Sequence, residues 1–152
     1  MRQDWIEYWY NEAINRSKRS KDANTKVGAV IVSEEDNVEI SSGWNCLPRS
    51  VRHTEERNSR PLKYLLTSHS EISAITNAAL MGRSTKGMAI FVTLFPCSQC
   101  AAALINSGIK KVYAPESDFT HEQYGESFKW SLQMFKEAKV RVEYVRKESG
   151  SY

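Results

Sequence analysis

A regular alternation of helix and strand patterns governs the choice of fold for this chain. Residues 27–33 form a continuous apolar run rich in β-branched side chains, which indicates a buried strand. After a polar turn, residues 38–44 return as a second strand and complete a hairpin. Helical and strand patterns then alternate as helix 71–81, strand 88–94, helix 97–107, strand 111–114, helix 122–138 and strand 140–145. This order predicts an α/β fold with three α-β-α layers, in which a mixed five-stranded sheet carries helices on both faces.

The length of the chain favours one domain, which we expect to span residues 1–152. Such a chain can bury a core but is too short for two ordinary domains. Residues 5–19 predict a helix before the hairpin, and residues 45–67 form a long Arg-rich loop with room for a short helix. The sequence has no apolar run of about 18 residues and no signal-peptide core, so we expect a cytoplasmic protein without a membrane span.

The charge balance is mildly basic. The sequence has 21 basic and 18 acidic side chains, a net charge of +3. This balance suits a small anionic substrate, but it is also that of an ordinary solvated surface. A polynucleotide site would need a basic groove with stacking aromatic side chains, whereas the Arg-rich loop offers only Tyr64 and is diluted by Glu55 and Glu56.

Two short motifs carry the metal-binding and acid–base side chains. The triplet H-S-E occupies residues 69–71 at the start of a predicted helix. The run P-C-S-Q-C occupies residues 96–100, between a predicted strand and the next helix. Together and in this order, H-x-E and P-C-x-x-C are the signature of zinc-dependent nucleobase deaminases.

The chemistry of that reaction explains these residue types. His69, Cys97 and Cys100 are predicted to bind one zinc ion, because a catalytic zinc takes three protein ligands and leaves a fourth position for water. A helix N-terminus also favours the thiolate form of cysteine. Zinc lowers the pKa of bound water from about 15.7 to roughly 7, which makes hydroxide available to attack C4 of cytosine. Glu71, two residues after His69, is predicted to shuttle the protons.

Each motif alone has a less specific explanation. A C-x-x-C pair also occurs in redox sites and in structural zinc sites. The odd count of three cysteines argues against a disulfide framework, and no second pair is present for a four-cysteine structural site. We expect Cys46 to be a small, half-buried residue, because a fourth ligand would close the site to water. We expect His53 and His121 to have surface or supporting roles rather than to bind metal.

Further segments match the pattern of one family. They are residues 17–32, Gly43-Trp44-Asn45, and residues 69–75, 93–101 and 108–112. Through them the chain resembles, from about residue 5 to residue 145, the cytidine deaminase-like superfamily and within it the deoxycytidylate (dCMP) deaminases. The resemblance implies that family's fold, one catalytic Zn²⁺ per subunit, and hydrolysis of dCMP to dUMP and ammonia, a reaction that feeds thymidylate synthesis.

The resemblance also implies substrate contacts. Asn45 would hydrogen-bond the sugar, and Asn24 and Lys26 would lie near the sugar and phosphate. The backbone N–H of Ser70 would help to hold the pyrimidine. Phe119 matches the aromatic position that covers the base, although core packing is an equal alternative for this side chain.

The sequence departs from the family pattern at a few positions. Ser70 and Ser73 replace the usual Ala and Asn of the H-A-E-x-N-A-I motif. Residues 46–50 stand where the family usually has glycines, in a loop that in many members belongs to a site activated by dCTP and inhibited by dTTP. Side chains there restrict the backbone, so allosteric control is an open question. Members of this type are commonly hexamers, and we expect a homo-oligomer here.

The sequence is therefore compatible with four functions. The first is dCMP deamination, and the second is deamination of a related nucleotide or nucleoside such as dCTP, cytidine or modified dCMP. The third is a nucleic-acid cytosine deaminase, which the charge pattern disfavours. The fourth is a non-enzymatic zinc-stabilised module, which has no use for a free carboxylate such as Glu71 beside an open metal position.

Overall fold

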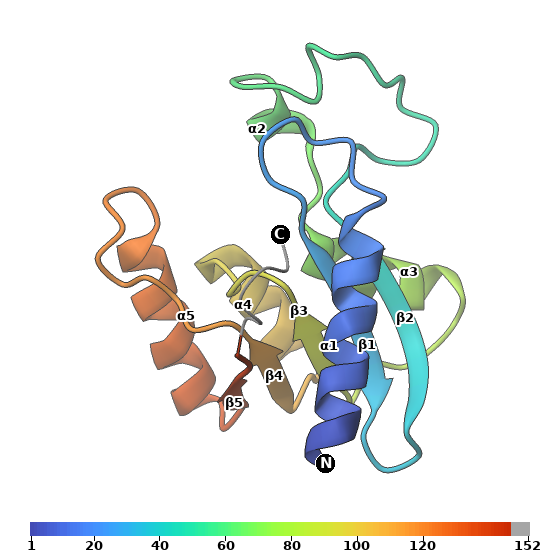
Figure 1. The fold of residues 1–152 in the computed structure, drawn as a ribbon, viewed down its shortest axis with the longest axis vertical. Coiled ribbons are helices and arrows are strands. Elements are labelled where there is room, and N and C mark those ends of the chain that lie inside the picture. The colour runs from blue at the N-terminus through green and yellow to red at the C-terminus, as the bar shows by residue number, and fades with distance from the viewer. Residues whose placement is uncertain (147–152) are drawn as a thin grey trace.

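The computed structural model describes residues 1–146 and shows a five-stranded sheet between helices (Figure 1). The helices are α1 (Gln3–Ser17), α2 (Lys63–Leu66), α3 (Ser70–Leu80), α4 (Ser98–Asn106) and α5 (Gly125–Glu137). The strands are β1 (Gly28–Ser33), β2 (Val38–Trp44), β3 (Ala89–Val92), β4 (Lys111–Ala114) and β5 (Arg141–Tyr144).

The sheet is mixed, with the strand order β2-β1-β3-β4-β5. Strand β1 pairs antiparallel with both β2 and β3, whereas β3, β4 and β5 are parallel to one another. Parallel neighbours need crossover connections, and α4 and α5 supply them. The start of β1 and the carboxyl ends of β3 and β4 therefore share one edge of the sheet, where ligands of open α/β sheets usually bind.

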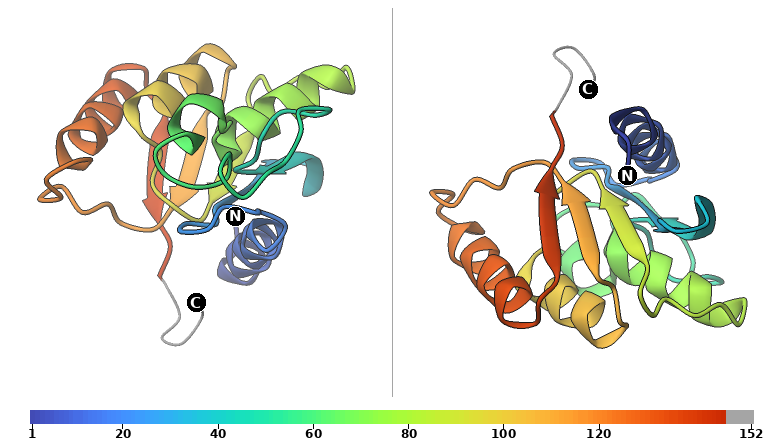
Figure 2. Two further views of the ribbon diagram at one scale, coloured as in Figure 1. Left: turned by 90° about the horizontal axis from the view of Figure 1, so that it is seen from above. Right: turned by 90° about the horizontal axis from the view of Figure 1, so that it is seen from below.

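Helices cover both faces of the sheet (Figure 2). Helix α1 lies on one face, and α3, α4 and α5 lie on the other. The side chains of β1 alternate accordingly: Val30 and Val32 pack in the cluster with α1, and Ile31 packs in the larger cluster beneath α3, α4 and α5. All three are fully buried. This alternation is the two-residue period of a strand that is covered on both faces.

Two glycines allow the helices to approach the sheet closely. A Cβ atom at Gly28 would lie 2.0 Å from the carbonyl oxygen of Ala13 in α1. A Cβ atom at Gly43 would lie 2.6 Å from the backbone nitrogen of Ala74 in α3. Larger residues at either position would push a helix away from the strand that it covers.

The predicted fold class is confirmed, and the element boundaries agree to within about three residues. The largest shift is at α5, which begins at Gly125 because the preceding residues form a separate turn. The long loop contains α2 as its short helix. A single domain over residues 1–152 stays a prediction, and its last six residues, 147–152, lie outside the described part of the chain. Within residues 1–146, no helix has the length and apolar character that crossing a bilayer requires.

Candidate metal centre and substrate pocket

The starts of α3 and α4 bring the three predicted zinc ligands together. His69 is the N-cap of α3, Cys97 is the N-cap of α4, and Cys100 lies in the first turn of α4. The Nδ1 atom of His69 is 3.6 Å from Sγ of Cys97 and 3.3 Å from Sγ of Cys100. A tetrahedral zinc ion, with bonds of about 2.3 Å to sulfur and about 2.0 Å to nitrogen, separates such ligand atoms by about 3.5 Å. The donor set therefore fits a zinc ion in both chemistry and spacing, and the three ligand atoms lie within 4.8 Å of one another.

The pKa values of the two cysteine thiols are shifted in opposite directions. A hydrogen bond from the Cys100 side chain, assisted by one from His69, lowers the pKa of the Cys97 thiol to about 4. The same contact with Cys97, together with burial, raises the pKa of the Cys100 thiol. The Cys97 contact also raises the pKa of His69. Cys97 is thus a ready thiolate, and a bound cation would deprotonate Cys100 as well.

Glu71 lies beside the three donors without being one of them. Its side chain is 5% exposed, and burial raises the pKa of its carboxyl group. The neighbouring Ser70, which is fully buried, donates a hydrogen bond of 2.6 Å from Oγ to Oε1 of Glu71. This hydrogen bond lowers the pKa of Glu71 and so opposes the effect of burial on it. It also holds one of the two carboxylate oxygens in place.

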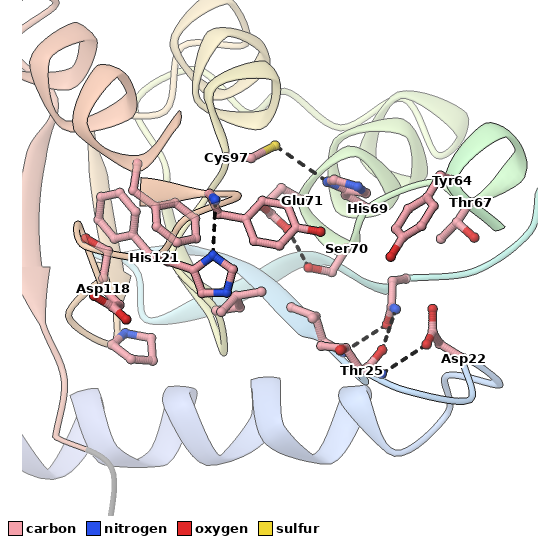
Figure 3. Close-up of a pocket in the computed structure, with 18 of the residues that line it drawn as sticks. Asp22, Thr25, Tyr64, Thr67, His69, Ser70, Glu71, Cys97, Asp118 and His121 are labelled. Atoms are coloured by element: carbon pink, nitrogen blue, oxygen red, sulfur yellow. Dashed lines mark hydrogen bonds between the residues drawn. The ribbon is translucent and has the colours of Figure 1, made fainter. Parts of the chain in front are cut away.

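Three of these residues, His69, Glu71 and Cys97, line a cavity of about 460 Å³, a size typical of small-molecule sites, and Cys100 lies buried behind them. Figure 3 shows His69, Glu71 and Cys97 within it, with Tyr64 and His121 nearby. We call His69, Glu71, Cys97 and Cys100 the pocket base. We call the loop segments 22–27, 60–67 and 115–124 the pocket mouth, since most of the remaining lining residues come from them.

A buried ion pair ties two segments of the mouth together. The Nζ atom of Lys63 lies 2.9 Å from Oδ1 and 3.1 Å from Oδ2 of Asp22, and both residues are buried. Asp22 also accepts the backbone N–H groups of Asn24 and Thr25. The Lys63 charge is therefore neutralised within the protein.

Arg60 is the contrasting cation of the mouth. It is exposed and lines the cavity, and among the described residues it has no hydrogen bond or ion pair. Its guanidinium is thus available to an anionic ligand. In the sequence Arg60 was one of several arginines in an irregular loop, and no pattern there distinguished it.

The predicted substrate contacts are divided between the pocket and its surroundings. Asn45 and Ser70 line the cavity, whereas Asn24 and Lys26 flank the lining residue Thr25. The amide of Asn45 is engaged inside the protein: its Oδ1 accepts the N–H of Val27, and its Nδ2 donates to the carbonyl of Thr25, both at 2.8 Å. Asn45 therefore holds the chain that leads into β1.

The aromatic lining differs from the expectation. Phe119 packs against the main core cluster and is absent from the cavity wall, as the core alternative predicts. The aromatic side chains of the wall are Tyr64, Phe95, Tyr124 and Phe128. Tyr64 belongs to a Lys-Tyr pair that precedes the metal motif in the sequence, and this pair was the available signal.

The other candidate ligands lie apart from the metal donors. Sγ of Cys46 is 3.9 Å from Oγ of Ser73 and is outside the three-donor group. His53 is exposed and does not line the cavity, whereas His121 is exposed and does. Of residues 1–146, only His69, Cys97 and Cys100 form a group that could hold a metal ion.

Comparison with known proteins points to one family. The model of the cytidine and deoxycytidylate deaminase zinc-binding region matches residues 3–116. An uncharacterized deaminase from the luxG 3′ region of Aliivibrio fischeri is 39% identical over 143 residues, which cover 93% of both chains. Human deoxycytidylate deaminase is 37% identical over 116 residues, which cover 72% of this chain but only 63% of the human protein.

Solved structures give the same result for the fold. The dCMP deaminase of cyanophage S-TIM5 in apo form superposes with a TM-score of 0.75 at 26% identity, over 95% of this chain and all of that one (100%). Its complex with dCMP and dUMP gives a TM-score of 0.77 at 23% identity, over 95% and 99% of the two chains. The cytidine deaminase-like architecture expected from the sequence is thereby confirmed.

Proposed function

The chain belongs to the cytidine and deoxycytidylate deaminase family of zinc-dependent hydrolases, and from this we propose that it converts dCMP and water to dUMP and ammonia. The observation that carries the proposal is the buried Glu71 carboxylate beside a three-donor zinc site, at the base of a cavity of nucleotide size. The homo-oligomer expected from the resemblance stays a prediction.

The residues of the base have separate roles in this proposal. A zinc ion held by His69, Cys97 and Cys100 would supply an activated water at neutral pH. Glu71 would accept a proton from that water and deliver it to N3 of the cytosine ring, and would later carry a proton to the departing amino group. A C4–O bond forms and the C4–N bond breaks, so one water is consumed for each ammonia released.

Burial suits Glu71 to this work. A carboxyl group must both accept and donate a proton during the cycle, which is easiest when its pKa approaches the working pH. Burial raises the pKa of Glu71 in that direction. The hydrogen bond from Ser70 holds Oε1, so Oε2 remains for the proton transfers.

The mouth favours a nucleotide over a nucleoside. The reacting ring must meet Glu71 and the metal donors of the pocket base, so the rest of the substrate extends toward the mouth. Arg60 is there, unpaired among residues 1–146, and a guanidinium suits bidentate phosphate contacts. The experiment is an ammonia-release assay of the zinc-loaded protein on dCMP, dCTP, CMP, deoxycytidine and a cytosine-containing oligonucleotide, with and without added dCTP and dTTP. Turnover of dCMP well above that of deoxycytidine supports the proposal, and preference for the nucleoside or the oligonucleotide contradicts it.

Glu71→Gln tests the proton-transfer role. The amide is nearly isosteric but cannot cycle a proton, so we expect kcat on dCMP to fall by about a thousandfold or more, at the upper part of what a general acid–base contributes. Zinc content, measured by elemental analysis, should remain one ion per chain. A variant with normal turnover would refute the assigned role of Glu71.

A further inference from the structure

His121 has one ring nitrogen committed to the backbone. It lies in the turn before α5, and its Nδ1 accepts the N–H groups of Gln123 at 3.1 Å and Tyr124 at 3.2 Å. Its own carbonyl accepts the N–H of Gly125 at 2.8 Å. Because Nδ1 is an acceptor in both contacts, a neutral ring carries its proton on Nε2.

The backbone contacts alone do not call for histidine. Accepting the N–H groups two and three residues ahead is the task of an N-cap, and Asn, Asp, Ser or Thr performs it with a single oxygen. Histidine adds a second nitrogen on the far side of the ring. Figure 3 shows this second nitrogen on the side of the ring away from the backbone contact, and His121 is one of the residues that line the cavity.

The position of the ring identifies the part of the pocket that it serves. The ring centroids of His121 and Tyr124 are 5.1 Å apart, and the charge of Arg60 acts on the same tyrosine. His121 and Arg60 are both exposed, unlike the buried Glu71 of the pocket base. The nearby Asp118 is engaged through Oδ1 by the backbone N–H and the hydroxyl of Thr120. The Nε2–H donor therefore belongs to the mouth, whose wall includes both His121 and Arg60.

We infer that His121 donates Nε2–H to the 5′-phosphate of the bound nucleotide, beside the guanidinium of Arg60. The inference rests on the proposed function, because it takes a cytosine nucleotide as the ligand. It assigns to the turn before α5 a part in distinguishing a nucleotide from a nucleoside.

The test is His121→Asn, which keeps an acceptor for the two backbone N–H groups and removes the donor. Zinc-loaded protein carrying Glu71→Gln, which prevents turnover, is titrated by calorimetry with dCMP and with deoxycytidine. We expect the Kd for dCMP to rise about tenfold or more, as for loss of a hydrogen bond to a charged group, and the Kd for deoxycytidine to change less than about twofold. The matched control His53→Asn, on an exposed histidine outside the cavity, should change neither.

The outcomes separate this inference from the proposed function. An unchanged Kd for dCMP, or an equal loss for both ligands, overturns the role of His121 at the phosphate. Failure of the wild-type chain to release ammonia from dCMP would overturn the proposed function, while the titrations would still report on His121. Should His121→Asn unfold, His121→Ser preserves a capping oxygen and is measured in the same way.

Discussion

The base and the mouth of the pocket are built by different means. The four side chains of the base come from the starts of two regular helices, α3 and α4, within five residues of sequence at each start. The mouth consists of three mainly irregular segments, one of which contains the short helix α2, and side-chain contacts such as the Asp22–Lys63 pair join them. A metal centre tolerates errors of only a few tenths of an ångström, and helix starts supply that precision. Substrate recognition is commonly placed on loops, which can vary while the scaffold persists.

The largest effect that we expect is the loss of zinc and of activity when one metal ligand of the base is removed. Cys97→Ala leaves two donors for zinc, so the variant should lose stoichiometric metal and all measurable deamination. Metal binding to the folded state also stabilises it, so the wild-type melting temperature should rise with added zinc and that of the variant should not. Elemental analysis and thermal unfolding with and without zinc check both expectations.

Cys46→Ala is the matched control for that experiment. Cys46 is a third cysteine that lies near Ser73 and outside the donor group. Its removal should leave zinc at one ion per chain. Stoichiometric zinc in Cys97→Ala would show that the assignment of the ligands is wrong and that the base is less dependent on its helix starts than we argue.

For the mouth, the expected loss is one of folding stability, caused by breaking the Asp22–Lys63 ion pair rather than by losing a metal ion. Asp22→Asn leaves the buried ammonium of Lys63 without its carboxylate, and breaking such a pair costs about 3 kcal/mol or more of the free energy of unfolding. Urea unfolding at pH 7 measures this loss. The double variant Asp22→Asn with Lys63→Met should recover part of it, since no unpaired charge remains.

The same pair predicts a pH dependence. Burial raises the pKa of Asp22, but the N–H groups of Thr25 and Asn24 and the Lys63 ammonium outweigh it, so the folded-state pKa lies below the usual value. The carboxylate therefore stabilises the fold above the unfolded-state pKa of about 3.9, and this contribution is lost as the pH falls through the lower folded-state pKa. The free energy of unfolding of the wild type should thus fall more steeply on acidification in this range than that of Asp22→Asn. Parallel slopes would mean that the pair does not hold the mouth.

The sequence predicts the base well because its constraints are local. Cys97 and Cys100 are three residues apart on one turn, and Glu71 follows His69 by two, so their relative positions follow from helix geometry once the helices are recognised. The strand pattern predicts the fold for the same reason, since the alternation of buried positions is a local property of β1.

The mouth is less predictable because its contacts join distant residues through irregular backbone. Lys63 meets Asp22 across 41 positions of sequence, and no spacing rule connects them. No sequence pattern distinguishes Arg60 and His121 from the arginines and histidines that lie elsewhere on the surface. Motif matching left two alternatives open for Phe119, whose partly buried side chain packs against the core cluster while Tyr124, five residues on, lines the cavity.

The smallest effect that we expect comes from Ser70, a departure from the family pattern that contacts Glu71 of the pocket base. Its hydroxyl donates to Oε1 of Glu71, a contact that the usual alanine cannot make. Ser70→Ala should retain zinc and lower kcat on dCMP about three- to tenfold, the worth of a modest hydrogen bond, with KM little changed. Ser73→Ala, at the other departure from the motif, should not lower kcat, because the Ser73 hydroxyl donates to Ser68 and not to Glu71. Steady-state kinetics of both variants decides the point: a Ser70→Ala enzyme as fast as the wild type would mean that burial and the metal alone orient Glu71, and that the serine is a neutral substitution.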